Sequence, residues 1–205
     1  MTTPLIMANM AVGLLRETDV TSVTSDTSNA GLAVAKYYSH VANDCLTRYP
    51  WSFATKKTLL VVGTAPLNEY TYGHTLPDAV LRLWALTTST AVGERPITDY
   101  DIQQPGSDRI VNSNYATLYA DHTYYVSEAY WPAYFVEFFH KALAAKLAIP
   151  ITDQAELAGF WKQEAWGTAQ ENELGGAFGI ACRIDSLQKP GEHINSDPLN
   201  EARFS

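Results

Sequence analysis

The sequence contains little cysteine, little charge and no long apolar run. Of its 205 residues, two are cysteines, Cys45 and Cys182, and 18% are charged. The two cysteines are far apart and have no cysteine or histidine at metal-ligand spacing, so we expect two reduced, buried thiols. No stretch approaches about 18 apolar residues, so we expect no membrane span. The first residues lack the basic flank and apolar core of a signal peptide, which predicts a soluble protein that is intracellular at synthesis.

The sequence also lacks the short motifs of common enzymes. The run from Gly175 to Gly179 lacks the lysine and hydroxyl residues that a phosphate-binding loop needs, and no Gly-x-Ser-x-Gly elbow is present. The numerous carboxylates near the C-terminus indicate a solvated helix face. We therefore expect no enzyme activity, no catalytic residue and no cofactor.

The histidines do not form a recognisable metal site. Asp121 and His122 are adjacent, and neighbours in a strand face opposite sides. His140 has Glu137 three residues before it, but the second histidine of a helical zinc motif is missing. We therefore expect no metal.

Basic residues are too few for a protein that grips nucleic acid. The formal net charge is −8, and an acidic chain lacks the electrostatic surface that attracts phosphates. Lys56-Lys57 is the one adjacent basic pair, and it lies beside Trp51 and Phe53. Such a group could bind a nucleic acid strand, with the lysines at the phosphates and the aromatic rings stacked on bases. The overall acidity argues against that interpretation, although an acidic wall can surround DNA without holding it.

What the sequence does contain is typical of a globular chain: 46% of its residues are hydrophobic and 12% are aromatic. Helical spacing of apolar residues predicts helices at 5–16, 29–48, 131–148 and 153–186. Pro150 should end the third helix, and Asp153 with Glu156 should form a capping box for the fourth. That fourth helix should continue, under strain, past Gly175, Gly176 and Gly179.

Short alternating runs between 56 and 127, separated by turn residues, predict a small and mainly antiparallel sheet. From Gln188 the helical period stops, and proline and glycine interrupt the chain. We therefore expect an α+β fold: a bundle of about four helices with an inserted β subdomain, in a domain covering 1–187. Residues 188–205 should form an extended tail, with Ile194, Pro198, Leu199 and Phe204 as its docking residues.

A structural hinge is predicted where the second helix meets the β-rich region. Pro50 cannot continue a helix, because its ring blocks the backbone hydrogen bond and clashes with the preceding turn. Trp51, Phe53 and Ala54 follow at this junction. They should form a packed joint between helices and sheet.

The order of several short motifs resembles a known family. Arg48 to Lys56 (RYPWSFATK) is followed by Leu76 to Leu83 (LPDAVLRL), by Trp131 to Phe135 (WPAYF) leading into Ala144 to Thr152 (AAKLAIPIT), and by Ala181 and Arg183. This succession resembles the tail tubular protein A family, the head-to-tail adaptors, or connectors, of short-tailed bacteriophages. The resemblance covers roughly residues 5–187. The break at 175–179 and the stretch 87–122 depart from the family pattern.

The resemblance implies a structural virion protein of the phage neck and tail. It implies a ring of twelve copies between the portal protein and the tail nozzle, possible contact with a tail fibre, and a channel through which DNA passes without specific binding during ejection. It implies no membrane partner.

Two alternatives of other classes remain open on the residues alone. One is a carbohydrate- or partner-binding module whose sheet displays aromatic residues, namely Tyr70, Tyr72, Tyr115, Tyr119, Tyr124 and Tyr125. The other is a hydrolase that uses carboxylates such as Asp78, or Asp121 with His122.

Overall fold

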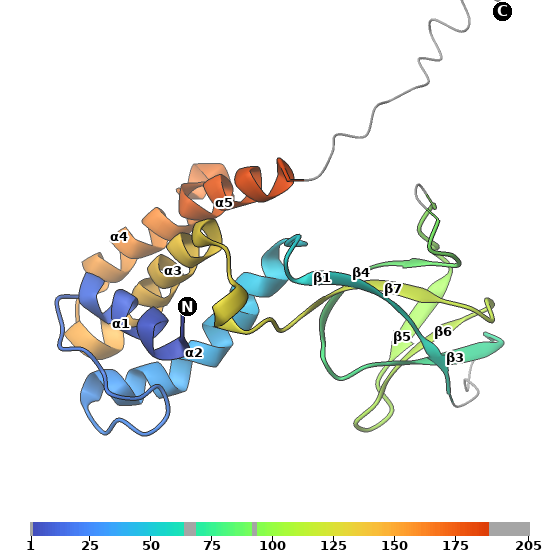
Figure 1. The fold of residues 1–205 in the computed structure, drawn as a ribbon, viewed down its shortest axis with the longest axis horizontal. Helices are drawn as coiled ribbons and strands as arrows, with labels where there is room; N and C mark the ends of the chain where they lie inside the picture. The colour runs from blue at the N-terminus through green and yellow to red at the C-terminus, as the bar shows by residue number, and fades with distance from the viewer. Residues whose placement is uncertain (1, 64–68, 92–93, 189–205) are drawn as a thin grey trace, which may run out of the picture.

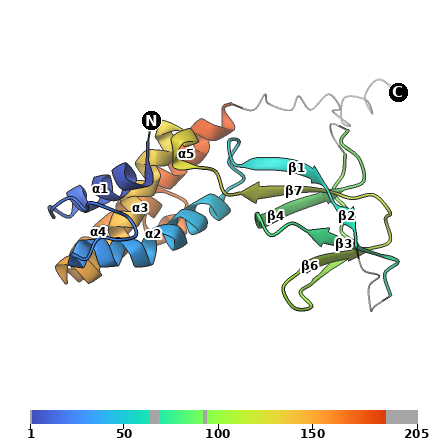
Figure 2. The same ribbon diagram turned by 60° about the horizontal axis from the view of Figure 1, so that its bottom comes forward.

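The computed structural model describes residues 2–63, 69–91 and 94–188. The fold is α+β, as predicted. The described residues form five α-helices and two small antiparallel sheets. The helices gather at one end of the molecule and the sheets at the other (Figures 1 and 2).

The first two helices begin close to their predicted positions. Helix α1 (Pro4–Leu14) starts at the N-cap Thr3 and ends two residues earlier than expected. Helix α2 (Asn29–Arg48) has the predicted bounds, with Ser28 as its N-cap. The Ser28 hydroxyl accepts a hydrogen bond from the Gly31 amide at 3.0 Å, which satisfies one of the free donors of the first turn.

The predicted β-rich region forms two sheets rather than one. The first has the strand order β1-β7-β4, and the second has the order β2-β3-β6-β5. The strands are β1 (Thr55–Leu59), β2 (Val61–Val62), β3 (Tyr72–Leu76), β4 (Val80–Thr87), β5 (Tyr100–Gln103), β6 (Arg109–Ser113) and β7 (Tyr119–Tyr124). The chain passes from the first sheet to the second at Leu60, which is buried between β1 and β2.

The two sheets enclose a small apolar core of their own. Its buried members are Leu60, Leu76, Val80, Leu86, Val111, Leu118 and Ala120. Because these residues come from both sheets, the β part has a separate hydrophobic cluster and does not depend on the helices to bury its inner face.

Helix α3 (Ala133–Thr152) is the central element of the helical part. It contacts each of the other four helices. The prediction that Pro150 ends it is wrong, because the helix continues two residues further. Pro150 removes one backbone hydrogen bond, which its amide would otherwise donate to the Lys146 carbonyl, and the helix ends two residues later. Asp153 then ends the helix in the left-handed conformation at φ 56° and does not cap the next one.

The prediction of one helix over 153–186 is also wrong. The chain forms α4 (Ala155–Trp166), a short 3₁₀ turn (Ala169–Glu171) and α5 (Gly176–Ser186). Helix α4 stops because Gly167 adopts φ +84°, and a Cβ atom there would lie 2.6 Å from the Cα atom of Gly175. The capping box expected at Asp153 is instead formed by Thr168 and Glu171.

The predicted joint after Pro50 is packed into the main core. Trp51 and Ala54 are completely buried, whereas Pro50 and Phe53 are half-buried. The Trp51 indole donates a hydrogen bond to the Cys45 carbonyl at 3.0 Å. Its ring packs against six other aromatic rings: Tyr49, Phe53, Tyr134, Phe135, Phe138 and Phe178. The joint therefore connects α2, α3 and α5 in one cluster.

Replacing Trp51 with alanine should lower the free energy of unfolding by about 3–5 kcal/mol, because the cavity would lie at the centre of this cluster. Chemical denaturation measures the change. Tyr130→Ala is the control, since Tyr130 is 76% exposed and its loss should change the stability little. A loss below about 1 kcal/mol for Trp51→Ala would mean that the joint is not packed as described.

Candidate interaction surfaces

A buried carboxylate ties the last helix to the joint. Asp185 is completely buried. It accepts hydrogen bonds from the Ser52 amide at 3.0 Å, from the Ser52 hydroxyl at 2.6 Å and from the Tyr134 hydroxyl at 2.6 Å. Burial, together with the hydrogen bond to Asp185 and its charge, raises the pKa of Tyr134 to about 12. The carboxylate thus joins α5, the joint and α3 at one point.

Sequence reasoning missed Asp185, although a pattern for it exists. Phe178, Ala181 and Asp185 recur at spacings of three and four, which places the acidic residue on the buried face of an amphipathic helix. A charged residue on such a face needs partners, because an unpaired buried charge is costly. An acidic residue on the apolar face of a helix therefore indicates, from the sequence alone, a buried side chain that has hydrogen-bond partners.

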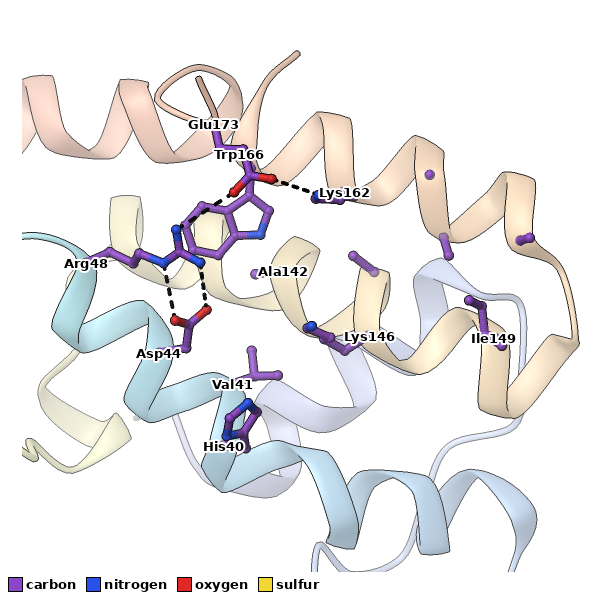
Figure 3. Close-up of a pocket in the computed structure, with 14 residues that line it drawn as sticks. His40, Val41, Asp44, Arg48, Ala142, Lys146, Ile149, Lys162, Trp166 and Glu173 are labelled. Carbon is purple, nitrogen blue, oxygen red and sulfur yellow. Dashed lines mark hydrogen bonds and ion pairs between the residues drawn. The ribbon is translucent and has the colours of Figure 1, made fainter. Parts of the chain in front are cut away.

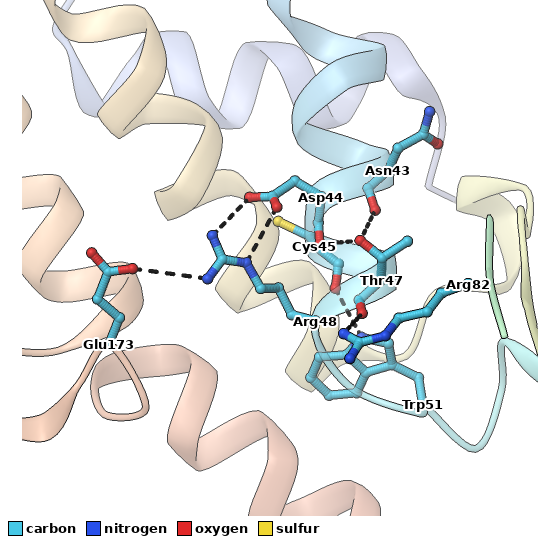
Figure 4. Close-up of polar contacts among 8 residues, drawn as sticks. All are labelled: Asn43, Asp44, Cys45, Thr47, Arg48, Trp51, Arg82 and Glu173. Atoms are coloured by element: carbon cyan, nitrogen blue, oxygen red, sulfur yellow. Dashed lines mark hydrogen bonds and ion pairs between the residues drawn. The ribbon is translucent and has the colours of Figure 1, made fainter. Parts of the chain in front are cut away.

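The sheets are attached to the helices by a few direct contacts. The Arg82 guanidinium on β4 donates a hydrogen bond to the Thr47 carbonyl near the end of α2 at 2.8 Å (Figure 4). The Tyr124 amide on β7 donates to the Ala54 carbonyl at 3.1 Å. Leu81 and Tyr124 also pack against the helical core. These contacts set the position of the first sheet relative to α2.

A groove runs between α2 and α4, with α3 as its floor. Its volume is about 480 Å³. Small residues form much of its lining, namely Ala142, Ala145, Ala155, Ala158 and Gly159. At the joint end, Arg48 lies between Asp44 and Glu173 and over the ring of Trp166, and Lys162 pairs with Glu173 at 2.7 Å (Figure 3). At the other end, the Asn29 side chain donates to the Pro150 carbonyl at 3.3 Å.

The groove carries more positive than negative charge. Three cations line it (Arg48, Lys146 and Lys162) against two carboxylates (Asp44 and Glu173). Among the described residues, no carboxylate lies within 4 Å of the Lys146 amine. Lys162, Arg48 and Lys146 hold the pKa of Glu173 below its usual range, mainly through the hydrogen bond from Lys162. The groove therefore has one net positive charge, and Lys146 is the lining cation that has no carboxylate of the described residues within 4 Å.

Gly159 has no role within the described chain that explains it. A glycine inside a helix costs about 1 kcal/mol relative to alanine. A Cβ atom at Gly159 would meet no atom within 4 Å. The residue therefore keeps the α4 wall of the groove bare, in a place where the fold itself has room for a side chain.

A second candidate surface is the outer face of α5. Ile180, Ile184 and Leu187 are 60%, 40% and 79% exposed. They follow the i, i+4, i+7 spacing of one helix face. Ile180 and Ile184 also line a second cavity of about 340 Å³ between α3, α4 and α5, together with Glu137 and Glu164.

The predicted docking residues of the tail, Ile194, Pro198, Leu199 and Phe204, lie outside the described residues. The side-chain oxygen of Gln188, the last described residue, lies 3.4 Å from the hydroxyl oxygen of Ser52. The tail therefore starts beside the joint.

The tyrosines of the binding-module alternative do not form one exposed face. Tyr115 and Tyr125 are exposed, and the other four are half-buried. Tyr124 packs against the helical core, and the Tyr125 hydroxyl donates to buried Glu128. Tyr119 and Tyr124 are five positions apart on β7, which places them on opposite faces.

The carboxylates and histidine of the hydrolase alternative are also separated. Asp78 is exposed in the turn before β4. Asp121 pairs with Lys57 at 3.4 Å, whereas His122 is buried on the other face of β7. His140 contacts Glu137 and the Val136 carbonyl. Within the described ranges, no three histidine, cysteine or acidic side chains are grouped to hold a metal ion.

The expectation of two buried thiols holds for Cys45 and is wrong for Cys182, which is half-buried. Cys45 lies in the core, and its pKa is well above the usual range. Burial raises the pKa of Cys182 to about 12. Among the described helices, none is both long and apolar enough to span a membrane.

Comparison with known proteins adds no assignment: neither the scan of protein-family models nor the search of curated proteins gives a match.

Removing the Asp185 carboxylate should lower the free energy of unfolding by about 2–4 kcal/mol, because the Ser52 amide and two hydroxyls would lose their acceptor. The variant is Asp185→Ala, and chemical denaturation measures the effect. Asp19→Ala is the control at an exposed position. Equal stabilities of the two variants would contradict the anchoring role of Asp185.

Burial lowers the pKa of His122 below its usual 6.5. The unfolded chain therefore binds a proton at His122 more tightly than the folded chain does. The contribution of neutral His122 to the free energy of unfolding is complete above about pH 6.5. It is lost as the pH falls through the folded-state pKa of His122, by at most about 1.4 kcal/mol per pH unit. Denaturation at pH 8 and pH 5 should show a larger loss for the wild type than for His122→Gln. The same loss in both proteins would contradict this expectation.

Proposed function

We propose that this chain is a head-to-tail adaptor of a short-tailed bacteriophage. In this role it is a structural protein of the virion neck. Copies of it form a ring between the portal protein and the tail nozzle, and the ring surrounds the channel through which DNA leaves the capsid.

The observation that carries the proposal is where the resembling motifs meet. Trp51, Trp131, Phe135 and Ala181 come from three separate motifs, and all four are buried in one cluster. Leu81, from a fourth motif, packs against that cluster. Residues from motifs that are far apart in the sequence pack together in this cluster. The set of motifs therefore supports the architecture of the resembled family more strongly than any one short motif does.

The two-part shape fits an adaptor. In our proposal the five helices act as the bundle, which faces the portal, and the two sheets form the inserted subdomain, which reaches toward the nozzle. The joint at Trp51 and Asp185 then fixes the angle between the two. An adaptor needs such a fixed angle, because each copy must present the same surfaces above and below the ring.

Charge also fits the proposed channel. The net charge of −8 favours a wall that repels the DNA backbone and does not hold it. A channel that bound DNA tightly would slow ejection.

The C-terminal tail is the proposed contact with the portal. Ordering its residues costs about 1–2 kcal/mol each in backbone entropy. The tail must therefore gain hydrogen bonds and buried anchors from a partner to become ordered. Ile194, Leu199 and Phe204 supply spaced apolar anchors of the kind that such a contact needs.

Deleting residues 188–205 should abolish attachment to the portal protein and leave the fold intact. Co-sedimentation with assembled portal measures attachment, and circular dichroism with thermal unfolding checks the fold. A second, full-length variant has Ile194, Leu199 and Phe204 changed to serine. It should lose attachment as well, because it keeps the length of the tail and lacks the apolar anchors. Attachment of either protein at the wild-type level would refute the role of the tail.

A further inference from the structure

The groove between α2 and α4 has a stretch of small apolar residues that no helix of the described residues covers. Alanines and Gly159 line it, so its walls lie close to the helix backbones. Gly159 weakens α4, and the groove side of this glycine is open. Gly159 lowers the stability of α4 and leaves this side of the groove without a side chain at its position. This combination indicates that another protein segment packs against α4 here.

The outer face of α5 has the form of such a helix. Ile180, Ile184 and Leu187 are exposed at the spacing of one face. Helices that bind in grooves present anchors at this same i, i+4, i+7 spacing. The branched side chains of the two isoleucines suit a wall of alanine and glycine, because that wall leaves room for them.

The charges beside the two surfaces are complementary. The lining of the groove has one net positive charge, and Lys146 is its cation without a carboxylate of the described residues within 4 Å. Glu137 and Glu164 flank the α5 face and share one lysine, Lys141, at 3.0 and 3.8 Å. Since Lys141 lies farther from Glu164, the Glu164 carboxylate has more capacity for a second cation.

We propose that the α2–α4 groove receives the α5 face of a second copy of this chain, with Lys146 of one copy close to Glu164 of the other. The two surfaces are different patches of one molecule and lie on opposite sides of α4. The contact is therefore head-to-tail and not two-fold symmetric. Repeated head-to-tail contacts close into a ring when the rotation between copies allows it. This inference rests on the proposed ring function and assigns the surfaces that would build the ring.

Disulfide trapping between two full-length variants tests the contact. One variant carries Ala155→Cys in the groove, the other carries Ile184→Cys on α5, and both carry Cys182→Ala. When the two are mixed and oxidised, the mixed disulfide should form at least about tenfold faster than between Ala155→Cys and Ile102→Cys, because docking raises the local thiol concentration. Ile102 is an exposed residue on β5, far from both surfaces. Equal rates would overturn the proposal.

A blocking variant provides the matched control. Gly159→Leu, added to the groove variant, should fill the groove and reduce trapping to the rate of the Ile102→Cys pair. Gly13→Leu makes the same chemical change at another glycine whose added Cβ meets open space, and it should leave trapping unchanged. Trapping that persists in Gly159→Leu would place the contact elsewhere.

A charge swap gives an independent measurement. Lys146→Glu and Glu164→Lys should each slow trapping, and the double variant should recover it, because every contact uses one residue from each copy. Failure of the double variant to recover would exclude the ion pair.

The location of the chain in the virion separates this inference from the proposed function. A chain found in the neck without trapping would overturn only the surface assignment. Trapping by a chain that is absent from the neck would overturn the adaptor function and leave the contact standing.

Discussion

The burial of Trp51 is the interaction on which the rest of the structure depends. Its ring touches aromatic residues of α3 and α5, and its indole nitrogen is bound to the last turns of α2. Directly after it, Ser52 binds Asp185 and Ala54 binds β7. The four residues from Trp51 to Ala54 thus connect three helices and a sheet. The chain changes from helix to strand here without becoming a loose linker.

The sequence analysis predicted the features that local chemistry decides. Helical spacing and Pro50 gave the bounds of α2, because apolar residues recur on one face from residue 29 onward and proline cannot continue a helix. The α+β class followed from the change of hydrophobic period at Pro50. The break between α4 and α5 was not predicted, since it depends on the close approach of Gly167 to Gly175, which are eight residues apart. The division into two sheets depends on strand pairing between distant segments, which no local pattern reports.

The candidate surfaces were even less accessible from the sequence. Trp51 could be identified, because a large aromatic beside a helix-ending proline is expected to pack. Asp185 looked like an ordinary acidic residue near a helix end, and only its tertiary partners, Ser52 and Tyr134, give it a role. Gly159 looked like a weak point of a helix. Its meaning appears only when the space beside it is known to be open and to face α2 across a groove.

These features combine into one mechanical account. In the proposed account, the joint fixes the angle between the helices and the sheets, Asp185 anchors α5 to the joint, and the tail continues from the end of α5. Outward-facing surfaces on α4 and α5 remain available for contacts with other chains. A rigid body with a fixed angle and several separate contact surfaces is what a ring between two larger assemblies requires.

The most direct test of this account is an image of the neck of virus particles that carry this chain, at a resolution sufficient to place its helices. The account predicts a ring of copies between portal and nozzle, with the helical part toward the portal and the sheets toward the nozzle. Particles in which the chain is absent from the neck, or lies there without forming a ring around the channel, would contradict it.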